Sequence, residues 1–161
     1  MIDEFCAAVI ADGSQAIRVP DASAARSAVT ELLAGDSLCF WDGDPLVASI
    51  DPASLGTVAP PSEAGAGITG ADWCIAATGT LVLTYGAGRS RQTGLLPDLH
   101  IAVVAATCIV ATLPEAIANV YAGDPPGAMT LVTGASATSD IEKIRVTGVH
   151  GPRRVAVVVV G

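Results

Sequence analysis

The residues that most clearly could do chemistry lie in a glycine-containing loop in the last third of the chain. Residues 129–133 have the composition of a buried strand, and Gly134, Ser136 and Thr138 follow it directly. A glycine and small polar side chains let a ligand approach the backbone N–H groups at the start of a helix. Ligands of open α/β sheets bind at the carboxyl ends of strands, where this loop is expected to lie. The loop is therefore a candidate ligand site.

The same loop also has a purely structural interpretation. Ser139 and Glu142 have the spacing of a capping box, in which two side chains satisfy the free N–H groups of a helix start. Asp140 and Glu142 also place negative charge at the positive end of the helix dipole, which disfavours an incoming phosphate. Two interpretations stay open: a ligand site that Asp140 helps to orient, and a helix start that needs no ligand.

A threonine turn is a second candidate. Thr78, Gly79 and Thr80 separate two predicted strands. A turn in which the glycine takes a positive φ explains the motif without any function. In the functional interpretation, the two threonine hydroxyls line a pocket beside the Gly134 loop.

Arginines and histidines supply the remaining candidates. Arg89 and Arg91 follow a pair of glycines and are the best partners for a carboxylate or phosphate in this acidic chain. His100 begins a predicted strand and His150 lies in a turn, and the ordinary pKa of a histidine side chain lies near neutral pH, which makes both candidates for acid–base work. We expect His150 to be structural and remote from the loop. We expect the threonine turn, Arg89 and the Gly134 loop to converge on one cleft.

The composition excludes several classes of function. The 161 residues carry 8 basic and 16 acidic side chains, a net charge of −8, which argues against binding a nucleic-acid backbone. Motifs for P-loop phosphoryl transfer, zinc proteolysis, α/β-hydrolase chemistry and Rossmann dinucleotide binding are absent from the sequence. The longest apolar run, residues 101–113, is shorter than the roughly 20 residues of a membrane span, and the acidic N-terminus is unlike a signal peptide. We expect a cytoplasmic protein.

The 4 cysteines do not have the spacing of a metal or cluster site. No pair shows the C-x-x-C pattern, and three of the four lie inside apolar runs. Such cysteines are usually small core residues rather than metal ligands or disulfide partners. We expect this chain to bind no metal and no cofactor of its own, and in particular no iron–sulfur cluster, which needs clustered thiolates.

The elements that must position these residues indicate one α/β domain over residues 1–161. Uninterrupted runs of valine, alanine and isoleucine suit strands that are buried on both faces of a parallel sheet, so we predict a layered sandwich around a mostly parallel sheet. Residues 129–133, a helix over 139–146 and a strand over 155–160 are predicted to form a right-handed parallel βαβ crossover. The other predicted helices are 2–10, 22–33 and 114–121, and the other predicted strands are 16–19, 37–41, 73–76, 80–85 and 100–105.

Four motifs in the same order resemble the lactate-utilization (LUD) domain family, and within it the lactate utilization protein C type. They occupy residues 78–83, 95–101, 134–142 and 148–153, and the resemblance covers about residues 66–161. It implies an α/β fold of the sugar-phosphate-isomerase and CoA-transferase-like superfamily. It also implies a role beside iron–sulfur and flavin-type partner proteins that oxidise L-lactate to pyruvate.

One departure from the family pattern bears on catalysis. The family commonly has an acid before its Thr-Gly-Thr motif, and this chain has Ala77 there. If that acid is a catalytic base, general acid–base work in this chain falls to Asp140, Glu142 or His100, or the chain is not catalytic.

Two functions of different class therefore remain open. The first is an accessory or ligand-binding subunit of an L-lactate oxidation system, which holds a small organic acid or a phosphorylated ligand. The alternative is a free-standing enzyme acting on a phosphorylated or CoA-type small molecule. A homodimer through the exposed face of the first predicted helix is also compatible with the sequence. The predicted ligand-binding residues are Thr78, Gly79, Thr80, Arg89, Gly134, Ser136, Thr138 and Asp140.

Overall fold

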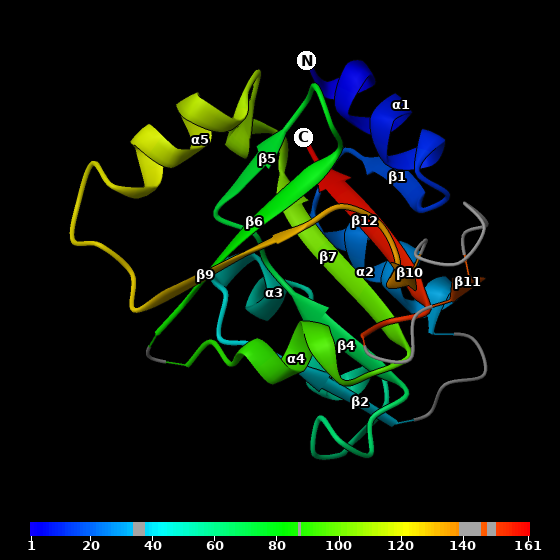
Figure 1. Ribbon diagram of the computed structural model, residues 1–161. Coiled ribbons are helices and arrows are strands. Elements are labelled where there is room, and N and C mark those ends of the chain that lie inside the picture. Colours follow the sequence, from blue (N-terminus) through cyan, green and yellow to red (C-terminus); the bar gives the residue numbers. More distant parts are fainter. Residues whose placement is uncertain (34–37, 87, 139–145, 148–150) are drawn as a thin grey trace.

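Two stacked β-sheets with helices on their outer faces make up the fold (Figure 1). The computed structural model describes residues 1–33, 38–86, 88–138, 146–147 and 151–161, and only the backbone of residues 137–138 and 146–147. Within these ranges, no helix is long and apolar enough to cross a membrane.

The larger sheet has six strands, and all of its pairings are parallel. Its central strand β7 is buried along nearly its whole length, because layers of side chains cover both of its faces. This confirms the predicted α/β class with a mostly parallel sheet. In spatial order the strands are β1 (Gln15–Val19), β12 (Arg154–Val160), β7 (Leu99–Ala105), β4 (Ala66–Thr69), β2 (Leu38–Trp41) and β3 (Thr57–Val58).

The smaller sheet has four strands of mixed direction. A tight turn, in which Gly79 has a φ of 66°, joins its two middle strands into an antiparallel hairpin. The fourth strand, β9, adds antiparallel to the hairpin and forms one edge of the sheet. In spatial order the strands are β8 (Ile109–Val110), β5 (Trp73–Ile75), β6 (Thr80–Tyr85) and β9 (Ala128–Val132).

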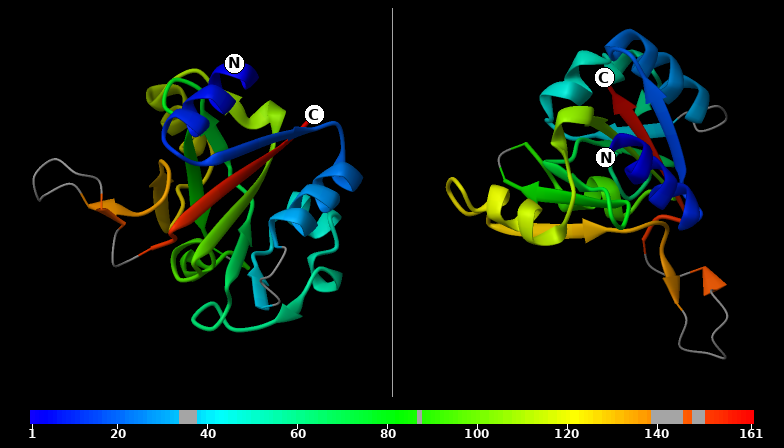
Figure 2. Two further views of the ribbon diagram at one scale, coloured as in Figure 1. Left: turned by 90° about the vertical axis from the view of Figure 1, so that its right-hand side faces the viewer. Right: turned by 90° about the horizontal axis from the view of Figure 1, so that it is seen from above.

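Helices cover the outer faces of both sheets, as the two views of Figure 2 show. Helices α2 (Ala22–Leu32) and α3 (Pro45–Ser49) cover one face of the large sheet, and the core there includes Val29, Ile68 and Ile101. The other face of the large sheet packs against the small sheet and helix α1 (Ile2–Ala11). Helix α5 (Leu113–Val120) covers the outer face of the small sheet.

Local capping signals set two of the helix starts. The Asp21 carboxylate accepts a hydrogen bond from Ala24 N, and the Asp44 carboxylate accepts from the backbone of the α3 first turn. Asp51 also precedes a proline at a helix start but does not act as a side-chain cap. It precedes a 3₁₀ turn (Pro52–Ser54) with a φ of 51° and makes no side-chain capping bond, and its carboxylate lies 3.3 Å from the Arg26 guanidinium instead.

The predicted βαβ crossover at the C-terminal end of the chain is wrong. Strands β9 and β12 belong to different sheets, so they are not parallel neighbours. Between them, β10 (Ala137–Thr138) pairs antiparallel with β11 (Val146–Thr147). Residue 146 is thus in a strand, and the rest of the predicted helix, residues 139–145, lies outside the described residues. Val146 and Thr147 are β-branched residues, which suit a strand, so the predicted helix does not include residue 146.

Strand β4 was not predicted from the sequence, although it lies at the centre of the large sheet. Its sequence is short and contains Gly67, which weakens a strand signal. The structure explains why a glycine is needed at position 67. A Cβ at Gly67 would lie 1.8 Å from the backbone oxygen of Thr93 in helix α4 (Arg91–Leu95), so only glycine lets α4 sit this close to the sheet.

We expect Gly67→Ala to destabilise the protein by roughly 1–3 kcal/mol, because the added methyl group must push α4 away from the sheet. Gly123→Ala is the matched control, since a Cβ there meets no atom within 4 Å. Urea unfolding of both variants measures the difference. Equal stability of the two variants would contradict the close seating of α4.

Candidate ligand-binding site

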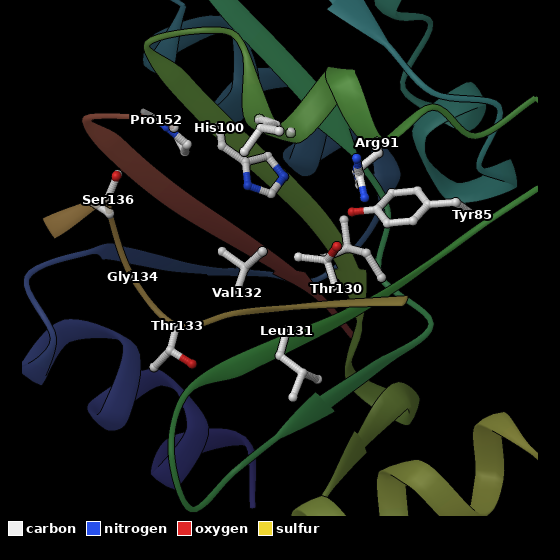
Figure 3. A pocket seen from close by; sticks show the side chains of 15 residues that line it. Tyr85, Arg91, His100, Thr130, Leu131, Val132, Thr133, Gly134, Ser136 and Pro152 are labelled. Carbon is white, nitrogen blue, oxygen red and sulfur yellow. The ribbon is translucent and has the colours of Figure 1, made fainter. Parts of the chain in front are cut away.

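A cavity of about 490 Å³ lies between helix α4 and the inner face of the β6–β9 pair (Figure 3). Its end wall comes from the segments that follow β9 and precede β12, and the start of β7 contributes His100. The large sheet therefore meets the cavity at the amino ends of its strands, whereas β9 meets it at its carboxyl end. The lining residues are Leu83, Tyr85, Arg91, Gly94, Leu95, His100, Thr130, Leu131, Val132, Thr133, Gly134, Ala135, Ser136, Gly151 and Pro152.

His100 is the buried polar group of this cavity. Its side chain is 0% exposed, and its Nε2 lies 2.8 Å from Thr69 Oγ1 in the neighbouring strand β4. Its other ring nitrogen, Nδ1, is buried and has no hydrogen-bond partner. Burial lowers the pKa of His100 to about 4, so the ring is neutral at pH 7. A buried polar atom without a partner is rare, and here it belongs to a residue that lines a cavity.

Arg91 and Tyr85 place a cation and a phenol at the same cavity. Arg91 is the first residue of α4, where the Ser90 hydroxyl caps the helix by accepting from Gln92 N. Its side chain is exposed, and within the described part of the chain it makes no ion pair. Figure 3 shows the Arg91 guanidinium and the Tyr85 hydroxyl reaching toward each other at one end of the cavity.

Strand β9 presents alternate side chains to the cavity. Thr130 and Val132 pair with Leu83 and Leu81 of β6, whose side chains belong to the core between the sheets. In Figure 3 Thr130 and Val132 point toward His100, whereas Leu131 points to the outer face. The floor below the imidazole is therefore mostly apolar.

The end wall of the cavity contains Gly134 and Ser136, two of the predicted site residues. Ser136 N donates to the carbonyl oxygen of Pro152 at 2.8 Å, which holds the two wall segments together. Gly134 has a φ of 75°, and a Cβ there would lie 1.7 Å from the Asp12 carboxylate. The glycine is needed for close contact with Asp12 as well as for the backbone conformation.

The threonine turn touches this site only at its margin. The hydroxyls of Thr78, Thr80 and Thr133 form a chain with successive oxygen–oxygen distances of 2.7 and 2.7 Å. Of these three residues Thr133 lines the cavity, and Thr78 and Thr80 do not. Gly79 instead packs on helix α1, because a Cβ there would lie 2.6 Å from Val9 N.

Arg89 is not at the cavity, so the predicted convergence of the candidate residues on one cleft needs correction. Its guanidinium lies 2.7 Å from the Asp72 carboxylate, 3.5 Å from Asp42 and 3.9 Å from Asp44. Asp42 follows β2 and Asp72 follows β4, so this cluster occupies the carboxyl edge of the large sheet. The charge of Arg89 is already compensated by this protein's own carboxylates.

One carboxyl group of this cluster, that of Asp42, has a shifted pKa. Burial raises the pKa of the Asp42 carboxyl, which the Asp44 backbone N–H and the charge of Arg89 only partly offset. A carboxylate this deep in the fold needs its cation, which assigns Arg89 a structural role.

Several predicted residues cannot be placed relative to the cavity. Asp140, Glu142 and His150 lie outside the described residues, as does the side chain of Thr138. Of the three predicted acid–base candidates, His100 is the one that the structure locates, and it lines the cavity. Among the described side chains there is no group of three or more His, Cys, Asp or Glu that could hold a metal ion.

Sequence reasoning did not place Tyr85, Leu95 and Thr130 at the site, and it gave Arg91 less weight than Arg89. The serine before Arg91 is a helix-cap signal that would have separated the two arginines. No local signal could have shown that β9 lies beside α4, since these elements are more than thirty residues apart.

Comparison with known proteins identifies the family. Residues 62–160 match the sequence profile of the LUD domain, and the chain belongs to the LUD domain family. This match covers nearly all of the stretch on which the resemblance in the sequence rests.

Individual relatives extend this finding. A lactate utilization protein C from Deinococcus radiodurans is 47% identical over 101 residues, which are 62% of this chain and 48% of that protein. Lactate utilization protein C from Halalkalibacterium halodurans is 31% identical over 140 residues, which are 82% of this chain and 56% of that protein. The chain thus spans about half the length of the curated relatives it matches. The crystal structure of a DUF162 family protein from Deinococcus radiodurans superposes with a TM-score of 0.72 at 27% identity, over 99% of this chain and 96% of that chain.

Replacement of Arg89 and replacement of Arg91 should have different effects on the stability of the protein. We expect Arg89→Gln to destabilise the protein by on the order of 3 kcal/mol, because it leaves the buried Asp42 carboxylate without a cation. Arg91→Gln should change stability by no more than about 0.5 kcal/mol, because exposed side chains without specific contacts contribute little. Denaturant unfolding of both variants tests this, and similar losses would contradict the assigned roles.

The stability of the protein should also depend on His100 between pH 6.5 and 4. In this range the unfolded chain, with an ordinary histidine pKa of 6.5, binds more protons than the folded state, where the pKa is about 4. Stability contributed by the neutral ring therefore falls as the pH falls, by on the order of 3 kcal/mol over the whole range.

His100→Gln provides the comparison for this measurement. The wild-type unfolding free energy should drop more steeply from pH 7 to pH 4 than that of the variant, since carboxylates titrate in both. Parallel pH profiles of the two proteins would show that His100 is not buried in the neutral form.

Proposed function

We propose that this chain is a ligand-binding accessory subunit of a lactate-utilising system and that its ligand is a small organic acid held in the cavity below α4. The observation that carries the proposal is the pairing, in one cavity, of Arg91 without an ion pair among the described residues and of His100 with its buried, unpartnered Nδ1. The relatives named lactate utilization protein C support the metabolic setting.

The cavity offers the groups that a 2-hydroxy acid needs. A guanidinium binds a carboxylate through charge-assisted hydrogen bonds, and Arg91 provides it. The neutral imidazole of His100 can donate a hydrogen bond to the 2-hydroxyl or 2-keto oxygen of the ligand or accept one from the 2-hydroxyl. The hydrogen bond between Thr69 and Nε2 holds the ring in place. Because the ring stays neutral from about pH 5 upward, it adds no second positive charge at neutral pH.

Oxidation of lactate to pyruvate releases two electrons, and we propose that partner proteins with iron–sulfur clusters accept them. The four cysteines are free and are spread over helix α1, strands β2 and β5 and the turn before β8, without the clustered thiolates that such a cluster requires. A cytoplasmic location, as the sequence predicts, is part of this proposal.

Titration calorimetry of the full chain with L-lactate and pyruvate tests the proposal. Arg91→Gln should weaken binding roughly 10- to 100-fold, the loss expected for a hydrogen bond to a charged group. Arg18→Gln is the control, because Arg18 is 54% exposed and belongs to strand β1, away from the cavity. Binding that is the same in both variants, or no binding of any organic acid to the wild type, would overturn the proposal.

A further inference from the structure

The cavity is larger than lactate requires. Lactate has six non-hydrogen atoms, which fill about 180 Å³ even at the roughly 30 Å³ that a water molecule occupies in the liquid. The cavity measures about 490 Å³, in the range typical of pockets for larger ligands. A three-carbon acid bound at Arg91 would leave more than half of this space to water.

The spacing of two α4 residues indicates how a longer ligand would lie. Arg91 and Leu95 are four residues apart on the helix, so both face the cavity and are separated by about 6 Å along its axis. In lactate, two C–C bonds of about 1.5 Å place the methyl carbon no more than about 3 Å from the carboxylate carbon. Lactate is therefore shorter than the axial distance between these two residues.

The surface between these two points is apolar. Leu83 and Val132 line the floor, and the Leu95 side chain reaches across to the end wall, where its Cδ1 lies 3.9 Å from a Cβ position on Gly151. Leu95 is nevertheless 44% exposed, which leaves apolar surface at the cavity that a ligand can cover. The exposed Leu131 does not contribute, because its side chain points to the other face of the sheet (Figure 3).

His100 fixes the position of a polar group on the ligand. In Figure 3 its ring lies between the end of the cavity with Arg91 and the end with Ser136. Gly94 of α4 packs against the ring, since a Cβ there would lie 3.1 Å from Nε2. The unpartnered Nδ1 can therefore donate a hydrogen bond to or accept one from a ligand oxygen that lies between the two ends of the cavity.

We infer that the site prefers 2-hydroxy or 2-oxo acids whose side chain is an alkyl chain of about four carbons or more, or an aromatic ring, over lactate and pyruvate. The carboxylate binds Arg91, the 2-oxygen binds His100, and the side chain packs between Leu95 and Val132. This inference rests on the proposed function, because it takes the carboxylate on Arg91 from it.

A homologous series measures the preference. L-Lactate, 2-hydroxybutanoate, 2-hydroxyhexanoate and 3-phenyllactate are titrated into the full chain at pH 7. Each added methylene that becomes buried should tighten binding about fourfold, so 2-hydroxyhexanoate, with three more methylenes, should bind about 60-fold more tightly than lactate. An affinity that is flat along the series, with lactate still bound, overturns this inference and leaves the proposed function intact. A series in which no acid binds overturns both.

Substitution of two neighbouring leucines tests whether the preference for longer ligands arises in this cavity. Leu95→Ser should reduce the ratio of the 2-hydroxyhexanoate affinity to the lactate affinity at least fivefold, because it removes the apolar residue against which the alkyl chain of the ligand packs. Leu96→Ser should leave the ratio unchanged, since Leu96 is similarly exposed, at 48%, but does not line the cavity. Both substitutions are at exposed positions and should preserve the fold. A ratio that Leu95→Ser does not reduce would place the side chain elsewhere and overturn the inference.

Discussion

The structure depends on the burial of strand β7 between two apolar layers. Leu99, Ile101 and Val103 pack below the α2 and α3 helices, and Ala102 and Val104 pack against the second sheet. A polar side chain on such a strand must find a hydrogen-bond partner or border a cavity, because unpaired polar atoms are costly in an apolar core. His100 does both: the Thr69 hydroxyl hydrogen-bonds one ring nitrogen, and the residue lines the cavity. The packing that stabilises the sheet thus also produces the polar centre of the candidate site.

Two arginines only two residues apart face different parts of the molecule because a helix begins between them. Arg89 lies in the loop before α4 and turns toward the carboxyl edge of the large sheet, where Asp42, Asp44 and Asp72 surround it. Arg91 opens α4 and faces the cavity. The ion cluster fills the edge where parallel sheets usually bind ligands, and the candidate site lies instead where β9 and α4 meet the amino ends of β7 and β12.

The sequence predicted those features that depend on local chemistry or on composition. The helices predicted over residues 2–10, 22–33 and 114–121 are α1, α2 and α5, because apolar residues recur there at helical spacing. The valine-rich run of β12 is a buried strand, because such residues suit a strand covered on both faces. Predictions that depended on contacts between segments far apart in the sequence failed more often. Strand β4 was missed because Gly67 weakens the strand signal, and this glycine is needed for the close approach of α4. Strand β9 was assigned to the wrong sheet because nothing in its own sequence specifies which strand it pairs with.

The amino-acid sequence by itself determined the α/β class, most helix and strand positions, the membership in a family with a characteristic C-terminal half, and the presence of His100 in a buried strand. Only the tertiary structure decided that the six-stranded and four-stranded sheets stack, that carboxylates surround Arg89, and that Arg91, Tyr85 and Leu95 share a cavity with His100. The physical reason is that propensity, capping and burial act over a few residues, whereas a cavity is defined by side chains from β6, α4, β7 and β9. The relative positions of these elements are fixed by packing, which no single segment encodes.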